Sequence, residues 1–147
     1  GERFKPHMVA AFEDPITGRR TLMAPQRLPS VNIENEFYWD NVLAAMHDVM
    51  QSPTGTARAA GANSDYEMAG KSGTAQVFTV AQEEEYNEDE IDVRLRDHAF
   101  FISFAQFLYP IIAVAVVIEN GSSGSRVAAP IARAIMDQYL LGGSVAL

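Results

Sequence analysis

Four consecutive residues in the stretch AGKSGTAQV combine a cation, two hydroxyl groups and a glycine: Lys71, Ser72, Gly73 and Thr74. Glycine weakens the interior of a strand, so its position before a β-branched segment suggests that another backbone approaches closely there. A lysine supplies positive charge, and two hydroxyls can donate hydrogen bonds to a carboxylate. We therefore predict a strand edge that binds an anionic acyl substrate as an added peptide strand binds a sheet.

The main chain just beyond this segment offers a second chemical function. The N–H group of Ala75 or Gln76 could donate a hydrogen bond to an oxyanion that develops on the substrate. A tetrapeptide of this kind also arises by chance in many proteins. The elements around it must therefore decide whether it is a site.

The composition excludes several classes of function. The 147 residues carry a net charge of −8 and no cluster of Lys and Arg, so we expect no nucleic-acid partner. Without cysteine there is no disulfide, thiolate metal site or cysteine nucleophile. The three histidines, His7, His47 and His98, lack the spacing of a metal site, and we expect neither a metal nor a cofactor.

An uncharged apolar segment, residues 99–118, is about as long as a membrane span. Pro110 in its middle, the Val and Ile of its second half and its end at ENG favour a different structure. We predict two antiparallel strands, residues 99–105 and 112–119, joined by a turn at residues 106–111.

Two other segments have the apolar spacing of helices. The first follows the candidate cap Asn35, and its core face is predicted to comprise Trp39, Val42, Leu43, Met46 and Met50. The second follows a Gly/Ser turn, with Pro130 in its first turn and Gly142 at its end. We expect this terminal helix to cover the sheet with Ile131, Ala134 and Ile135.

The remaining segments complete an α+β pattern. Residues 4–25 are predicted to form two short strands around a DPITG turn. Residues 83–92 hold seven acids, whose repulsion favours an exposed loop. The expected fold is therefore an antiparallel sheet with covering helices.

Longer stretches of the chain resemble the penicillin-binding transpeptidases, most closely the elongation-type penicillin-binding protein 2 group of class B. The K-T-G signature belongs to penicillin-binding proteins and to serine β-lactamases. The matching segments follow one another over nearly the whole length: GERFKPHMV, Trp39 with GTAR, MAGKSGTAQV, LRDHAFFISFA, IAVAVVIENG and GSRVAAPIARAIMDQYL. The resemblance implies that residues 1–147 form the C-terminal part of a transpeptidase domain.

The resemblance also implies an activity and a location. The intact protein would be a peptidoglycan D,D-transpeptidase, anchored at the periplasmic face of the bacterial inner membrane, that cross-links stem peptides during cell elongation. Its implied partners are the peptidoglycan stem peptide, β-lactam antibiotics, the remaining half of the transpeptidase domain and a glycosyltransferase of the elongation machinery.

The family's site residues carry over to matching positions in this chain. Lys71 would supply positive charge and assist proton transfer. Ser72 and Thr74 would hold the carboxylate of the substrate or β-lactam, with Gly73 giving clearance. The backbone of Gln76 would be an oxyanion-hole donor.

The chain departs from the family pattern at the nucleophile. None of its serines is followed by lysine three residues later, so the S-x-x-K motif is absent from these 147 residues. An S-x-N triplet occurs at Ser30-Val31-Asn32, after the place where the family motif should have appeared. A serine needs an adjacent base to attack, so we expect the nucleophile to lie outside this chain and the chain alone to be inert.

The turn at residues 106–111 departs as well, because its tip is apolar: Phe107, Leu108, Tyr109 and Ile111. Two interpretations are open, a contact with a partner or membrane surface and packing against a neighbouring loop. Two alternative functions are open as well. One is a serine β-lactamase or β-lactam sensor, and the other is a non-catalytic interaction module that uses the acidic loop or this tip.

Overall fold

The computed structural model describes residues 1–35, 37–77 and 91–142. The chain divides into two compact units, Gly1–Trp39 and Asp40–Leu147. The predicted acidic loop at residues 83–92 lies almost wholly outside the described residues. At its end, Asp92 caps a short 3-10 helix by accepting a 2.9 Å hydrogen bond from the Arg94 N–H.

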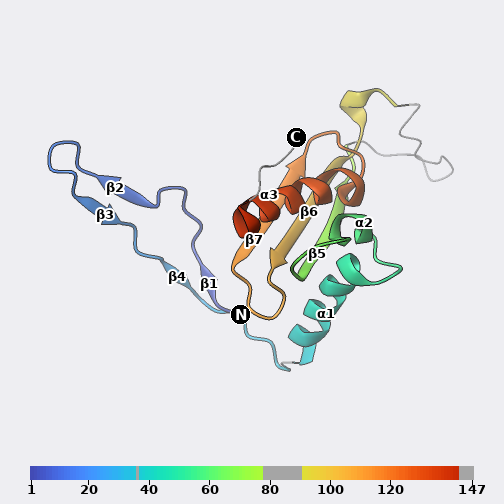
Figure 1. The fold of residues 1–147 in the computed structure, drawn as a ribbon, viewed down its shortest axis with the longest axis horizontal. Helices are drawn as coiled ribbons and strands as arrows, with labels where there is room; N and C mark the ends of the chain where they lie inside the picture. The colour runs from blue at the N-terminus through green and yellow to red at the C-terminus, as the bar shows by residue number, and fades with distance from the viewer. Residues whose placement is uncertain (36, 78–90, 143–147) are drawn as a thin grey trace. The chain divides into compact units, whose positions relative to one another are not determined.

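The first unit consists of two antiparallel ribbons (Figure 1). Strand β1 (Arg3–Phe4) pairs with β4 (Arg27–Leu28), and β2 (Ala11–Glu13) pairs with β3 (Arg20–Leu22). The β2–β3 ribbon confirms the predicted strands around the DPITG turn.

Asp14 organises that turn. Its carboxylate accepts hydrogen bonds from the Thr17 N–H at 2.8 Å and the Ile16 N–H at 2.9 Å. Because both bonds favour the charged form, they lower the pKa of Asp14 below its usual value. Gly18 adopts a φ of 67°, in the left-handed region that glycine tolerates best, and closes the turn.

The second unit is built on a three-stranded antiparallel sheet in the order β5-β6-β7 (Figure 1). The strands are β5 (Met68–Ala75), β6 (His98–Ala105) and β7 (Ile112–Ile118). The predicted hairpin is confirmed by β6 and β7, which pair from Ala99 with Ile118 to Ala105 with Ile112. No described helix is long and apolar enough to cross a membrane.

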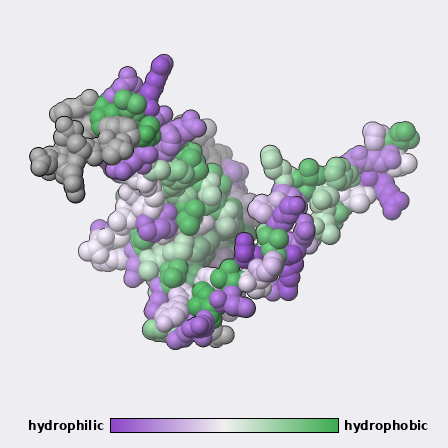
Figure 2. Space-filling model, turned by 180° about the vertical axis from the view of Figure 1, so that it is seen from behind, coloured by the Kyte–Doolittle hydropathy of each residue, from purple (hydrophilic) through white to green (hydrophobic). Residues whose placement is uncertain are grey.

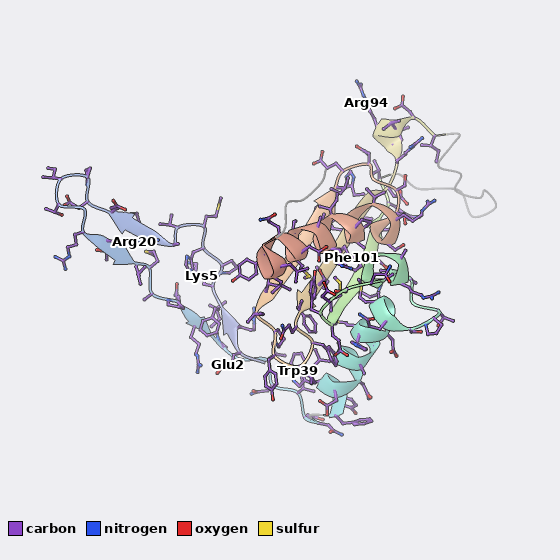
Figure 3. All side chains as sticks on the ribbon, viewed as in Figure 1. Glu2, Lys5, Arg20, Trp39, Arg94 and Phe101 are labelled. Atoms are coloured by element: carbon purple, nitrogen blue, oxygen red, sulfur yellow. The ribbon has the colours of Figure 1, made fainter. Side chains whose placement is uncertain are left out.

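The other elements of this unit are helical. They are α1 (Phe37–Gln51), which starts in the first unit, α2 (Arg58–Gly61), the 3-10 turn η1 (Val93–Leu95), the π-helical turn η2 (Gly124–Ala128) and α3 (Ala129–Leu141). Helix α3 lies across one face of the sheet (Figure 1). Phe101 of β6 is fully buried in this core (Figure 3), which also contains Met50, Met68, Ala132 and Met136.

Helix α3 confirms the predicted ends but not the predicted buried face. Pro130 stands in its first turn, and Gly142 follows it in the left-handed conformation with a φ of 62°. The expectation that Ile131 and Ile135 face the sheet was wrong, because both are exposed. The residues that pack are Ala129, Ala132 and Met136. The alanines have small side chains, so the helix axis can approach the sheet closely.

Helix α1 likewise has the predicted start but only part of the predicted buried face. Its cap is confirmed, because Asn35 accepts a 3.0 Å hydrogen bond from the Phe37 N–H. Met50 is buried, whereas Val42 and Leu43 are exposed, so the predicted core face was wrong at these two positions. The spacing identified a helix with an apolar stripe, but only its C-terminal end is covered by described residues.

The turn between β6 and β7 is partly packed. Phe107 is half-buried, and its ring centroid lies 4.5 Å from that of His47 and 6.3 Å from that of Phe104. Its N–H donates a 3.1 Å hydrogen bond to the Glu67 carbonyl oxygen. Leu108 and Tyr109 are exposed. Phe107 therefore packs against neighbouring residues. A contact with a partner or membrane surface remains an interpretation only for the exposed residues Leu108 and Tyr109.

Candidate functional site

The segment Lys71–Thr74 lies within β5, the outermost strand of the described sheet. On one side β5 pairs with β6 over its whole length, with Lys71 opposite Ile102 and Gly73 opposite Phe100. Among the described residues no strand pairs with its other edge. The segment therefore lies at an open strand edge within the described part of the chain.

The strand separates the polar side chains between the two faces of the sheet. Residues directly opposite in an antiparallel pair share a face, and successive residues alternate. Ser72 pairs with Phe101 and Thr74 with Ala99, so both hydroxyls lie on the face that α3 covers. Lys71 lies on the opposite face. The structure therefore places the two hydroxyls on one face of the strand and the Lys71 side chain on the other.

The Lys71 side chain reaches the open edge of β5. Its side chain is exposed, and its amino group donates a hydrogen bond to the Ser72 carbonyl oxygen. In an antiparallel strand the N–H and C=O groups of one residue point to the same edge, and neighbouring residues alternate. The open edge therefore carries the main-chain groups of Ser72 and Thr74. Gln76 comes directly after the last strand residue and two positions after Thr74.

Gly73 itself is not crowded on its own side. A Cβ atom built on Gly73 would meet only the Cβ of Phe100, at 3.4 Å, which is an ordinary contact. Within the described residues nothing prevents a side chain here. The predicted clearance for a substrate thus remains a prediction, because only a bound peptide would need that space.

A second glycine, which belongs to the Gly/Ser turn before the terminal helix, lies against this strand. Gly124, the first residue of η2, is buried, and a Cβ atom built on it would lie 2.6 Å from the Gly73 carbonyl oxygen and 3.1 Å from the Gly73 nitrogen. In the sequence alone, the run GSSGSR indicates only a turn. The requirement for glycine at this one position comes from tertiary packing.

The loop that leads to η2 is tied to the start of β6. The Asn120 N–H donates a 2.9 Å hydrogen bond to His98 Nδ1, and the Asn120 side-chain amide donates to the carbonyl oxygens of Arg94 and Arg96, each at 2.9 Å. The Ser122 N–H donates to the Asp97 carbonyl oxygen at 2.8 Å. Because His98 pairs with Ala75, these bonds lie at the same end of the sheet as the hydroxyls.

The other candidate features include no residue of β5. Ser30 and Asn32 belong to the first unit, after β4. Among the described residues, hollows of about 290 Å³ lie beside the β6–β7 turn at Glu67 and Phe107 and between Met46 and the sheet at Ile102. No cluster of three or more His, Asp or Glu that could hold a metal occurs in the described ranges. Within the residues that the structure describes, the sequence motif and an open strand edge coincide at β5.

The chain is similar to known proteins over most of its length. The family model for the penicillin-binding protein transpeptidase domain matches residues 1–137. The chain is 38% identical over 135 residues to the peptidoglycan D,D-transpeptidase MrdA of Haemophilus influenzae, a match that covers 92% of this chain and 20% of that protein.

Solved structures give the same result. Pseudomonas aeruginosa PBP2, solved in complex with WCK 5153, superimposes with a TM-score of 0.65 at 43% identity, over 81% of this chain and 23% of that chain. PBP2 in a complex with MreC from Helicobacter pylori superimposes with a TM-score of 0.57 at 25% identity, over 82% of this chain and 22% of that chain.

These matches confirm the α+β transpeptidase fold and the resemblance read from the sequence. The chain spans about a fifth of the length of the relatives it matches. Family membership follows from the match over 137 of 147 residues, and the chain belongs to the penicillin-binding protein transpeptidase-domain family.

Proposed function

We propose that this chain is the substrate-binding C-terminal part of the transpeptidase domain of a penicillin-binding protein 2, a peptidoglycan D,D-transpeptidase of cell-wall elongation. One observation carries the proposal. The residues Lys71, Ser72, Gly73 and Thr74 occupy the open edge of β5, with both hydroxyls on one face, in a chain that matches the family over nearly its whole length.

The site would bind the stem peptide as an added strand. An extended peptide laid against β5 would pair with the outward main-chain groups of Ser72 and Thr74. It would displace the Lys71 amino group from the Ser72 carbonyl oxygen and free that cation for the anionic end of the substrate. The hydroxyls of Ser72 and Thr74 would donate to the carboxylate, and hydrogen bonds to a charged acceptor are the stronger kind.

The chemistry requires a serine that this chain does not contain in an S-x-x-K motif. In the intact protein that serine would attack the substrate carbonyl and form an acyl-enzyme, while a neighbouring base takes its proton. The negative charge that develops on the carbonyl oxygen would be stabilised by the Gln76 N–H. An acceptor amine would then attack the acyl-enzyme and complete the cross-link, and the chain alone would be inactive.

The sheet surface is consistent with the proposal that another part of the domain covers it. On the side opposite α3, apolar residues gather over the sheet (Figure 2). Ile102 and Val117, which lie on that face, are 52% and 57% exposed. We propose that the remaining half of the transpeptidase domain covers this surface and carries the nucleophile.

The setting of the intact protein is proposed from the family. It would work at the periplasmic face of the inner membrane, bind stem peptides and β-lactam antibiotics, and cooperate with a glycosyltransferase of the elongation machinery. The complex of Helicobacter pylori PBP2 with MreC suggests an MreC-like protein as a further partner of the whole protein.

An intact-mass measurement on the full-length protein tests the proposal. After incubation with a penicillin, we expect one added β-lactam mass, on a peptide outside these 147 residues, and slow loss of that adduct. Rapid loss of the adduct would instead indicate a β-lactamase. Absence of any adduct would indicate a non-catalytic module, and an adduct on a serine of this chain would contradict the proposed division of roles.

A further inference from the structure

Gly124 is buried against the backbone of the substrate-binding strand. A Cβ atom there would contact the carbonyl oxygen of Phe100 and would lie 2.6 Å from the carbonyl oxygen of Gly73. Its third neighbour is the Gly73 nitrogen, at 3.1 Å. All three atoms belong to the backbone of the paired residues Gly73 and Phe100, so none can move aside as a flexible side chain would.

The turn η2, which begins with Gly124, is held against β5 by contacts on both sides of this residue. On the side before it, the Ser122 N–H is bonded to the Asp97 carbonyl oxygen at 2.8 Å. On the side after it, Ala128 at the end of η2 and Ala129 at the start of α3 are fully buried in the core. Within η2, the Val127 N–H donates a 2.9 Å hydrogen bond to the Ser123 carbonyl oxygen. Steric strain introduced at position 124 would therefore be transmitted to β5.

We propose that Gly124 is a positioning residue of the active site. By allowing η2 to lie directly on the Gly73 backbone, it sets the location of β5 and hence of the Ser72 and Thr74 hydroxyls that flank Gly73. This inference rests on the proposed function, because it assumes that those hydroxyls bind the substrate carboxylate. Gly124 makes no contact with substrate in this account.

A second buried glycine provides a matched control. A Cβ atom on Gly61, at the end of α2, would contact the Met50 carbonyl oxygen, with the Met50 carbon at 3.1 Å. The clash is again with backbone, but it involves α1 rather than β5. Gly61→Ala and Gly124→Ala should thus both lower the melting temperature, while only Gly124→Ala should displace the hydroxyls.

The test compares two acylating probes on the full-length protein, a penicillin and the methyl ester of its carboxylate, at a temperature at which each variant is folded by circular dichroism. The ratio of the two acylation rates reports recognition of the carboxylate. We expect Gly124→Ala to slow acylation by the penicillin about 10–100-fold and to bring the ratio close to one, since small misplacements of binding groups have effects of this size. Gly61→Ala should keep the wild-type ratio.

A wild-type ratio in Gly124→Ala, or an equal loss of the ratio in Gly61→Ala, would overturn the inference. If Gly124→Ala does not fold, Asn120→Gly decides the matter. It tolerates the φ of 56° but loses the hydrogen bonds to Arg94 and Arg96, so the turn is loosened without added bulk. The ratio should then fall a few-fold, and an unchanged ratio would overturn the inference. No acylation of the wild type would overturn the proposed function itself.

Discussion

The hydroxyl of Tyr66 donates a 2.7 Å hydrogen bond to the carboxylate of Asp137, 71 positions away in the sequence. Tyr66 precedes β5 by two residues, and Asp137 lies on α3. Arg133, one turn earlier on α3, donates to the same carboxylate oxygen at 2.7 Å, and its guanidinium lies 5.5 Å from the Tyr66 ring centroid. This cluster ties the terminal helix to the beginning of β5.

Arg133 should be the most sensitive member of the cluster. Besides Asp137, it donates to the carbonyl oxygens of Ala60 and Ala62, both at 3.1 Å. Arg133→Ala leaves these acceptors without their donor, so we expect a loss of about 2–3 kcal/mol in unfolding free energy, against about 1 kcal/mol for Tyr66→Phe. The midpoint of urea unfolding of the full-length protein measures both variants. Equal effects of the two changes would show that the backbone acceptors contribute little.

Tyr66 should make stability fall at alkaline pH. Burial, followed by the hydrogen bond to Asp137, raises the pKa of Tyr66 well above its usual value of about 10. The unfolded chain releases this proton near pH 10 while the folded chain retains it. The contribution is therefore complete below pH 10 and is lost as the pH rises toward the folded pKa. Tyr66→Phe should flatten the alkaline decline in melting temperature, and an unchanged decline would assign it to other groups.

Thr74 should affect the binding of a negatively charged ligand rather than the stability of the fold. Thr74→Val keeps the shape of an exposed strand residue but removes the hydroxyl that, in the proposed function, would donate to the ligand carboxylate. A hydrogen bond to a charged group contributes about 1.5–3 kcal/mol, so acylation by a penicillin should slow about 10–100-fold. Stopped-flow acylation of the full-length protein measures this rate. Thr74→Ser should stay near the wild-type rate, and equal slowing of both variants would point to packing instead.

In the tip of the β6–β7 turn, Phe107 should contribute to the stability of the fold and Leu108 should not. Phe107 packs on His47 and Phe104, whereas Leu108 is 74% exposed. Phe107→Ala should lower the unfolding free energy by about 1–2 kcal/mol, as expected for a half-buried aromatic contact. Leu108→Ser should leave the melting temperature within about one degree of wild type, because exposed substitutions have small effects. A marked fall for Leu108→Ser would place that side chain in a packed interface.

Local sequence signals predicted the elements well. The Val and Ile content around Pro110 separated two strands from a membrane span, and the strands appeared at the predicted positions. Asn35, Pro130 and Gly142 marked helix ends because capping and left-handed conformations are local properties.

Burial was predicted less well because it depends on what each helix meets. Spacing alone predicted that the larger Ile131 and Ile135 are buried, but the face of α3 that packs on the sheet carries alanines. The requirement for glycine at position 124 was likewise not visible, because it arises from a strand about fifty residues earlier in the chain. Residue types alone identify the KSGT motif, whereas the open edge of its strand depends on the order of the strands in the sheet, which is a tertiary property.

A crystal structure of the full-length protein acylated by a penicillin tests the role of β5 most directly. The ligand carboxylate should lie within about 2.5–3.0 Å of the Ser72 or Thr74 hydroxyl oxygen, and the acyl carbonyl oxygen within about 2.7–3.2 Å of the Gln76 nitrogen. A carboxylate bound elsewhere, with the edge of β5 unoccupied, would contradict the assignment of this strand as the substrate-binding element.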